Sequence, residues 1–284
     1  MATLSEIAVH PIKGLQPVEP DEITIAKGGG LEYDRKYALF SREEEYINGR
    51  RNSEIQRIRS EFDLESDIVT LWTDTDDRKR RFHIEKERAA LEEWFSDFFS
   101  EPVTLQRAHT NFTDNAGALS RKMLTTPGPS VIAHETLREV ASWFPGLIDG
   151  PEEMRLRTRP NLVVDGVDPF WEERLYADED SVVRFDIGDV SVQGLRPLPR
   201  CSVPAQNPAT GELIETFVSE FVEKRRETFP EWGDPDLLGS HDELDAGQYY
   251  LAVVTRLPTS EWGKTIAIGD EVSVEGTTSL ITAL

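Results

Sequence analysis

The chain is divided into many short segments with the side-chain pattern of β-strands, and this division limits its fold more than any other feature. Residues 4–9 and 22–25 alternate apolar and polar side chains, which is typical of half-buried strands. Helical spacing of apolar residues is seen at 89–99, 134–143 and 216–226. Further strands are expected at 37–40, 67–72, 80–84, 161–164, 182–185, 190–193, 249–255 and 271–274. Because strands and helices do not alternate regularly, the sequence predicts a mainly β fold with a few helices (α+β), built from β-barrels.

The length of the chain favours two domains. With 284 residues it corresponds to roughly two units of about 150 residues, although one large β-rich domain is also possible. Residues 111–129 are polar and rich in Gly, Thr and Pro, which indicates a linker. We therefore expect domains at 1–115 and 116–284.

The charge is strongly negative and spread along the whole chain. It contains 53 acidic and 31 basic residues, a formal net charge of −22. A surface of this sign repels phosphate backbones and argues against nucleic acid as a partner. The basic residues are 23 Arg and 8 Lys. A dispersed acidic excess of this kind suits a halophilic cytoplasm, where the Debye length shrinks to about 3 Å at 1 M salt; an ordinary acidic protein is the alternative.

The hydropathy pattern gives no sign of a membrane segment. No apolar run approaches the roughly 18–20 residues of a spanning helix, and the first six residues do not resemble a secretion signal. The sequence predicts a soluble, cytoplasmic protein with no membrane partner.

The cysteine and histidine positions exclude several kinds of site. A single cysteine, Cys201, allows neither an internal disulfide nor a zinc or iron–sulfur site built on several cysteines. His134 and Glu135 begin like an H-E-x-x-H zinc motif, but position 138 is Arg. The glycine run at 28–30 is not followed by the Lys and Ser/Thr of a phosphate-binding loop, and no G-x-S-x-G segment is present.

Cys201 lies in a stiff, polar loop. Pro199 and Pro204 flank it, and Arg200 precedes it directly. A neighbouring guanidinium favours the thiolate, which is the form that attacks electrophiles or binds a soft metal. The alternative is an inert cysteine packed as a small apolar side chain, but the polar loop argues against it.

Three arginines at alternate positions form a second candidate. In a strand, Arg155, Arg157 and Arg159 would lie on one face and form a cationic row. Arginine binds phosphate through two parallel hydrogen bonds, so the row predicts an anionic ligand. The alternative is a set of surface arginines paired with Glu152 and Glu153.

Three further pairs are candidates for the same ligand. They are Lys13 with Gly14, Asp34 with Arg35, and Arg50 with Arg51. Glycine lets a backbone approach a ligand closely, whereas runs of charge are usually solvated.

Taken in chain order, these segments resemble the MOSC superfamily, named after the C-terminal domain of molybdenum cofactor sulfurase. The resemblance is to members that also carry the MOSC N-terminal β-barrel domain, such as the mitochondrial amidoxime reducing components and their bacterial relatives. The matching segments are HPIKG at 10–14, GLEYDR at 30–35, TRPNLVVDG at 158–166, IGDV at 187–190, RC at 200–201, TG at 210–211, GQY at 247–249 and IGD at 268–270.

The resemblance implies a role for each matching residue. Cys201 would be the thiolate ligand of molybdenum and the catalytic residue. The residues that would hold the molybdopterin and its phosphate are Lys13, Gly14, Arg35, Arg159, Asn161, Arg200 and Thr210. This chain differs from the family at Gly14 and at His134, where relatives often have Ser, and at 202–205, where a Thr-rich stretch is common.

The resemblance also implies an activity. We expect a molybdenum cofactor-dependent oxidoreductase that reduces N-hydroxylated or related N–O or S–O compounds, with a small molecule as substrate. Because one cysteine cannot hold an iron–sulfur cluster, electrons would come from a separate donor, such as a ferredoxin-type protein with its reductase. The alternatives are a non-catalytic cofactor carrier, a sulfur-transfer module with a persulfide on Cys201, and a purely structural pair of barrels.

Overall fold

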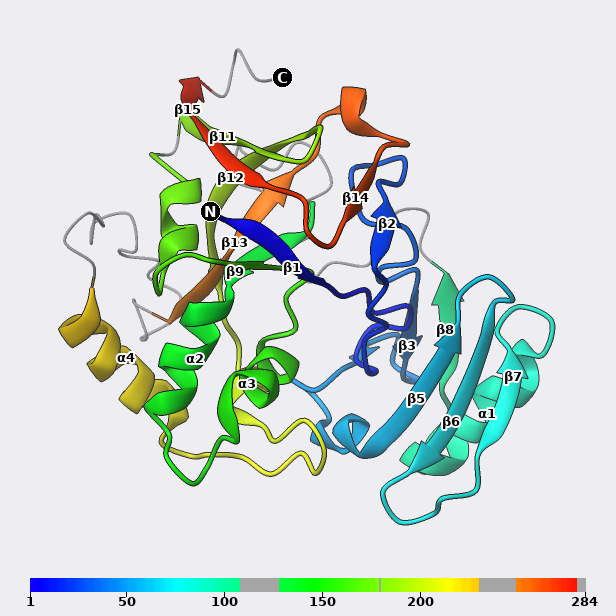
Figure 1. The fold of residues 1–284 in the computed structure, drawn as a ribbon. Coiled ribbons are helices and arrows are strands. Elements are labelled where there is room, and N and C mark those ends of the chain that lie inside the picture. The colour runs from blue at the N-terminus through cyan, green and yellow to red at the C-terminus, as the bar shows by residue number, and fades with distance from the viewer. Residues whose placement is uncertain (108–127, 179, 230–248, 280–284) are drawn as a thin grey trace.

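The largest element is a curled sheet of seven strands. The computed structural model describes residues 1–107, 128–178, 180–229 and 249–279. The strands of the large sheet lie in the order β1 (Thr3–Ile7), β10 (Leu162–Asp165), β9 (Ser130–Ala133), β13 (Tyr250–Arg256), β12 (Val190–Pro199), β11 (Ser181–Ile187) and β15 (Val272–Ser279) (Figure 1).

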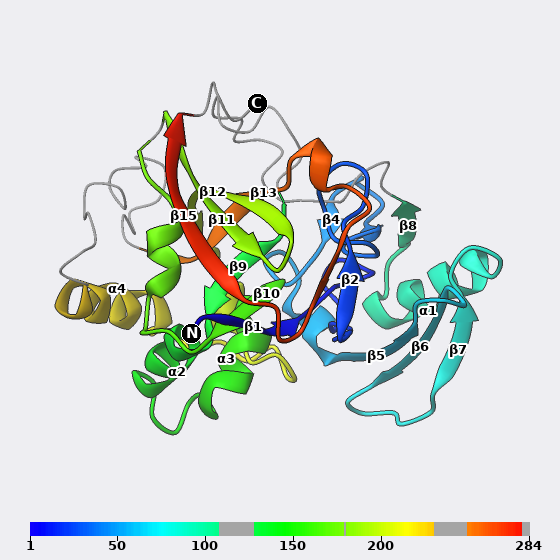
Figure 2. The same ribbon diagram turned by 45° about the horizontal axis from the view of Figure 1, so that its top comes forward.

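The two edges of this sheet approach each other. An antiparallel bridge joins Thr3 of β1 to Glu271, just before β15, so the sheet curls toward a barrel (Figure 2). Neighbouring strands of the sheet are antiparallel, apart from the parallel pair β9 and β10. Strands β9 and β13 are buried along their whole length, because apolar side chains are covered on both faces of the sheet.

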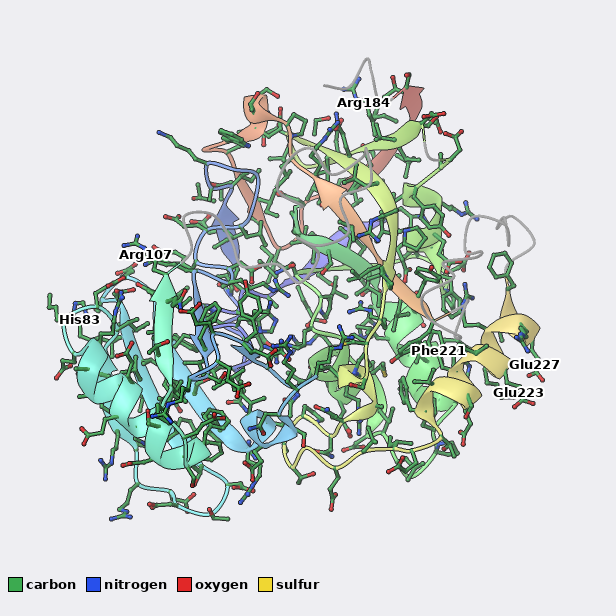
Figure 3. The ribbon with its side chains drawn as sticks, turned by 180° about the vertical axis from the view of Figure 1, so that it is seen from behind. His83, Arg107, Arg184, Phe221, Glu223 and Glu227 are labelled. Carbon is green, nitrogen blue, oxygen red and sulfur yellow. The ribbon has the colours of Figure 1, made fainter. Side chains whose placement is uncertain are left out.

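Helices cover one face of the curled sheet. They are α2 (His134–Ser142), α3 (Gly150–Thr158) and α4 (Phe217–Thr228). Phe217 and Phe221 of α4 are buried; Phe217 stacks on Phe144, and the ring of Phe221 meets that of Tyr249 edge to face. Figure 3 shows Phe221 turned toward the body of the molecule and Glu223 and Glu227 turned to solvent, the pattern of an amphipathic helix.

The first hundred residues build smaller sheets with their own core. Two of these sheets are β4 (Tyr46–Ile47)–β3 (Tyr37–Phe40)–β8 (Thr104–Arg107) and β5 (Ile58–Asp63)–β6 (Ile68–Thr73)–β7 (Arg80–His83). Helix α1 (Arg88–Phe99) buries Leu91, Phe95 and Phe99 in this core. Figure 1 places α1 and β5–β7 on the opposite side of the molecule from α4.

Two N-terminal strands pair with strands from the second half of the chain. Strand β1 pairs with β10, and β2 (Glu22–Thr24) pairs with β14 (Thr265–Ala267). The short 3₁₀ helices are η1 (Ser53–Arg57), η4 (Trp171–Leu175), η5 (Val203–Ala205) and η7 (Thr259–Glu261). The predicted domain boundary at 115/116 and most of the predicted linker at 111–129 lie outside the described residues, as do positions 247 and 248 of the GQY segment.

The predicted fold class is confirmed, since the described chain is mainly β with a few helices. The predicted strand at 37–40 coincides with β3, and the predicted helix at 89–99 coincides with α1 apart from one residue. Among the described residues, no helix has both the length and the apolar character needed to cross a bilayer.

The predicted strand of alternating arginines is wrong. Arg155 and Arg157 lie on helix α3, and Arg159 is the residue that ends it. The helix is favoured by Pro151 in its first turn and by acidic residues near its start and basic residues near its end, which complement the helix dipole. The alternation of arginines therefore does not place them on one face.

Candidate functional site

Arg159 is the residue at which helix α3 ends, and its side chain has different contacts from those of Arg155 and Arg157. It has the left-handed backbone conformation (φ 52°) at the C-terminus of α3, where its N–H donates to the carbonyl of Arg155 at 2.7 Å. The turn carries its guanidinium toward the segment after β1. There Nη2 lies 2.8 Å from Nδ1 of His10 and donates to the carbonyl of Leu15.

The other two arginines of this segment are already paired. The side chain of Arg155 is 6% exposed and contacts Glu6 at 2.8 Å and Glu152 at 3.1 Å, as well as Glu19. Arg157 is also buried and contacts Glu153 at 2.6 Å. The pairing with Glu152 and Glu153 considered from the sequence is confirmed, although the arginines are buried rather than on the surface.

Arg35 approaches Arg159 from the N-terminal half. It lies in a turn before β3, where its N–H donates to the carbonyl of His10 at 2.8 Å and Asp34 accepts from the N–H of His10 at 2.9 Å. The guanidinium of Arg35 contacts Asp34 and donates to Oδ1 of Asn161 at 3.4 Å. The turn therefore fixes Arg35 beside the segment that follows Arg159.

Asn161 ties three segments together. Its Oδ1 also accepts from Ser130 at the start of β9, and its Nδ2 donates to the carbonyl of Ala8 at 3.0 Å. The side chain is 3% exposed. In the described structure, Asn161 therefore holds Arg35 and the strand ends in place.

Arg200 brings a third guanidinium to the site and lies directly beside Cys201. Its Nε donates to the carbonyl of Leu251 and its Nη1 to that of Thr158, both at 2.7 Å. Its Nη2 is buried and has no hydrogen-bond partner in the described part of the chain. Cys201 is exposed in the loop after β12, as the sequence predicts.

The three guanidiniums of Arg35, Arg159 and Arg200, here called the arginine cluster, carry excess positive charge. Within the described ranges, Asp34 is the carboxylate that forms an ion pair with a member of the cluster. Burial and then the charge of Arg35 lower the pKa of Arg159 to about 9. Burial likewise lowers the pKa of Arg200 to about 10, despite the opposing effects of Tyr249 and Cys201. Groups held against such repulsion are typical of a site for an anion.

The loop after Cys201 is fastened to the N-terminal half. Nε2 of Gln206 donates to the carbonyl of Gly49 at 2.7 Å, and Oε1 of Gln206 accepts from Gln56 at 3.4 Å. Arg59 donates to the carbonyl of Ala209 at 2.9 Å. Both halves of the chain therefore fix the position of the cysteine loop.

The remaining predicted site residues have different surroundings. Lys13 is buried, with Nζ 4.2 Å from the ring centroid of Tyr46. Gly14 has φ +98°, and a Cβ there would meet Ile55 at 2.5 Å, so this glycine is required by the backbone and by its neighbour. Thr210 is exposed, and its hydroxyl donates to Glu212 at 3.3 Å.

The arginine pair at 50 and 51 is not brought into the cluster. Both residues are exposed, and Arg51 contacts Glu45 at 2.9 Å. They form the solvated charge run that was the alternative in the sequence.

Two residues of the site received no role from the sequence. His10 belongs to the HPIKG segment and contacts Arg159, yet its position alone gives no sign of this partner. The hydroxyl of Tyr249 is buried without a partner in the described residues, and burial raises its pKa. For His10, the available signal was a polar residue between the apolar Val9 and Pro11.

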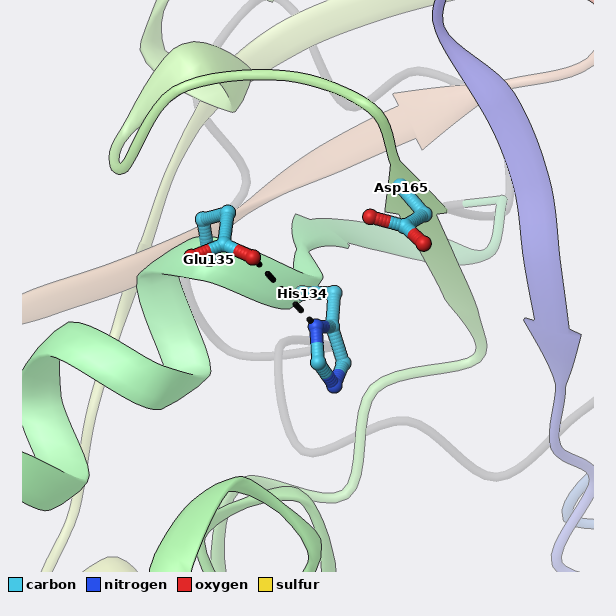
Figure 4. A group of neighbouring side chains, drawn as sticks. All are labelled: His134, Glu135 and Asp165. Atoms are coloured by element: carbon cyan, nitrogen blue, oxygen red, sulfur yellow. Dashed lines mark ion pairs between the residues drawn. The ribbon is translucent and has the colours of Figure 1, made fainter.

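A second group of possible metal ligands lies at the other end of the same strands. One ligand atom each from His134, Glu135 and Asp165 lie within 4.8 Å of one another (Figure 4). They lie at the carboxyl ends of β9 and β10, whereas Ser130 and Asn161 lie at the amino ends. These three are partly or fully exposed, and Glu135 already contacts Arg138 at 3.2 Å.

Comparison with known proteins gives two family matches. Residues 1–102 match the MOSC N-terminal beta barrel domain, and residues 130–273 match the MOSC domain. The two matches together include the arginine cluster, Cys201 and the turn that holds Arg35.

One curated relative is a molybdenum cofactor sulfurase from Oryza sativa subsp. japonica. It is 21% identical over 249 residues, a match that covers 75% of this chain and 29% of the plant protein. The chain thus spans about three tenths of the length of that relative. Since the MOSC domain model alone covers half of the residues, the chain belongs to the MOSC family, in the form that carries the N-terminal β-barrel domain.

Proposed function

We propose that this protein binds a molybdenum cofactor, with Cys201 as the metal ligand, and works as an oxidoreductase on N-hydroxylated or related N–O or S–O compounds. The observation that carries the proposal is the arginine cluster beside the exposed thiol of Cys201. A phosphate group suits the cluster, and a soft metal suits the thiolate.

The described residues fit such a cofactor. Buried polar atoms are normally hydrogen-bonded, yet Nη2 of Arg200 and the hydroxyl of Tyr249 have no partner in the described chain. Among the described residues of the same region there are three guanidiniums, and one of them, Arg35, forms an ion pair with the carboxylate of Asp34. A ligand with acceptor oxygens and negative charge would provide hydrogen-bond partners for these atoms and would balance the positive charge.

Each residue has a distinct part in this proposal. Arg159 and Arg35 bind the phosphate, and Asn161 holds Arg35 in place. Arg200 fixes the cysteine loop by donating to the carbonyls of Thr158 and Leu251. The bound cofactor supplies two-electron oxygen-atom chemistry. Overall, the hydroxylamine-type substrate R–NHOH gains two electrons and two protons to give R–NH₂ and water, and the electrons come from a separate donor protein.

Turnover of holoprotein with a chemical electron donor tests the reaction. Oxidation of a reduced viologen should depend on an N-hydroxylated amidine and should fall by about a hundredfold or more in Cys201→Ala. Ser202→Ala, in the same exposed loop, is the matched control and should retain turnover. Fully loaded protein without substrate-dependent turnover would disprove the reductase activity.

Sulfur transfer is the second candidate, and two observations favour it. The thiol is exposed, and the plant relative is named for a sulfurase activity. In this alternative Cys201 carries a persulfide, whose outer sulfur reacts with cyanide to give thiocyanate. Thiocyanate release that is lost in Cys201→Ala, together with absent reductase turnover, would favour transfer.

A further inference from the structure

The ring of His10 is buried beside Arg159 of the arginine cluster. The side chain is 2% exposed. Its backbone N–H donates to Asp34 at 2.9 Å, and its carbonyl accepts from the N–H of Arg35 at 2.8 Å. The position of the ring therefore depends on the same turn that holds Arg35.

The contacts of Nδ1 decide the tautomer. Nη2 of Arg159 lies 2.8 Å from Nδ1, and a guanidinium can only donate. Nδ1 also lies 3.3 Å from the carbonyl of Leu15, a contact that would suit a proton on Nδ1. The contact with the guanidinium is shorter and has only one possible direction, and the carbonyl of Leu15 already accepts from the same Nη2, so Nδ1 presents its lone pair. A neutral imidazole carries one proton, which is then on Nε2. The neutral form agrees with the surroundings, because burial and the charges of Arg159 and Arg35 hold the pKa of His10 well below its usual value.

The N–H at Nε2 has no acceptor in the described structure. The atom is buried and makes no hydrogen bond with any described residue. An unpaired buried donor is costly and rare, so its acceptor is expected on a ligand. Nη2 of Arg200, in the same cluster, is unpaired in the same way.

We propose that His10 has two roles at this site: Nδ1 positions Arg159, and Nε2–H donates a hydrogen bond to an oxygen of the phosphate-bearing ligand. A neutral donor adds a hydrogen bond without a fourth positive charge beside three guanidiniums that already repel one another. The inference rests on the proposed function for the identity of the cofactor but not for the chemistry of the ligand oxygen.

Nitrogen-15 NMR of the full-length protein, without cofactor, tests the tautomer directly. At pH 7 the ring of His10 should be neutral, with its proton on Nε2. Inorganic phosphate should shift the Nε2–H resonance and slow its exchange with water. A proton on Nδ1, a charged ring, or no response to phosphate at a concentration that saturates the protein would overturn the proposal.

Two variants separate the two roles. In His10→Asn the amide oxygen can replace Nδ1 as acceptor for Arg159, but the Nε2 donor is lost. In His10→Gln a donor reaches the Nε2 position, but the Nδ1 acceptor is lost. Each should weaken binding of inorganic phosphate by about tenfold, the value of one charge-assisted hydrogen bond.

Combination with Arg159→Lys identifies which role each variant removes. Added to His10→Asn, Arg159→Lys should cost as much affinity as it does in the wild type, because Arg159 is still held. Added to His10→Gln, it should cost clearly less. Wild-type phosphate affinity in both single variants would contradict the proposal. A protein that shows the predicted tautomer and phosphate response but never takes up molybdenum would disprove the proposed function and leave the role of His10 intact.

Discussion

Arg155 and Arg159, four residues apart on this chain, have opposite surroundings. Arg155 pairs with carboxylates, whereas Arg159 contacts a neutral histidine and a carbonyl. We expect Arg159→Lys to lose most of the bound pterin with the fold retained, because an ammonium lacks the planar pair of donors that binds phosphate. Pterin oxidised to its fluorescent form, with circular dichroism as the fold control, measures this.

Arg155→Lys is the matched control for that prediction. It should keep its pterin but lose about 1–3 kcal/mol of folding free energy, because the buried contacts with Glu6 and Glu152 are disturbed. Full pterin retention in Arg159→Lys would exclude the phosphate assignment.

The exposed thiol of Cys201 gives a second test at this scale. Iodoacetamide should label it rapidly in protein without cofactor and slowly in loaded protein, because a metal-bound sulfur is no longer a free nucleophile. Equal labelling of both forms would show that the thiol is not a metal ligand.

Glu172 makes stability depend on pH. It is 1% exposed, and burial, followed by the charge of Glu173, raises its pKa from 4.5 to about 8. Between pH 4.5 and about pH 8, Glu172 carries a proton in the native state that it has lost in the unfolded state. This residue therefore makes the free energy of unfolding fall as the pH rises. Relative to Glu172→Gln, the free energy of unfolding of the wild type should fall by up to about 1.4 kcal/mol for each pH unit in this range. Urea unfolding at several pH values measures the difference, with exposed Glu93→Gln as control. Parallel curves for wild type and Glu172→Gln would refute the assignment.

At the scale of elements, the sequence predicts individual strands and helices well and their partners poorly. The apolar pattern of α1 or β3 is local, so it is readable from the chain. The alternating arginines of helix α3 imitate the pattern of a strand, although Pro151 and the charge order along the segment indicate a helix. The contact of His10 with Arg159 joins residues 149 positions apart, and only the tertiary fold creates it.

Strand β12 contains a glycine that its neighbours require. A Cβ on Gly194 would lie 1.6 Å from the carbonyl oxygen of Leu175, which is backbone and cannot move aside. Gly194→Ala should therefore destabilise the protein by more than about 3 kcal/mol, whereas Ser191→Ala in the same strand should change little. Thermal unfolding measures both. A Gly194→Ala protein as stable as the wild type would show that β12 does not pack on η4 in this way.

At the scale of the whole molecule, the charge of −22 predicts a response to salt. If the acidic excess reflects adaptation to high salt, the unfolding temperature should rise substantially between dilute buffer and molar KCl, because screening removes self-repulsion. Differential scanning calorimetry across that range measures it. A flat or falling unfolding temperature would count against the halophilic interpretation.

The two halves of the molecule meet at the site, which is why neither half alone reveals it. Arg35 and His10 come from the first match, and Arg159, Arg200 and Cys201 come from the second. The family segments pointed to Arg35, Arg159 and Cys201 from the sequence, but the donors left without partners became visible only in the folded chain.

The central claim is that these two halves together hold a molybdenum cofactor through Cys201. The most direct test is the metal and pterin content of the protein purified from a host that makes the cofactor, measured by mass spectrometry and pterin fluorescence. We expect near-stoichiometric molybdenum and pterin in the wild type, and loss of the molybdenum in Cys201→Ala. Zinc or no metal in the wild type, or full molybdenum in Cys201→Ala, would contradict the claim.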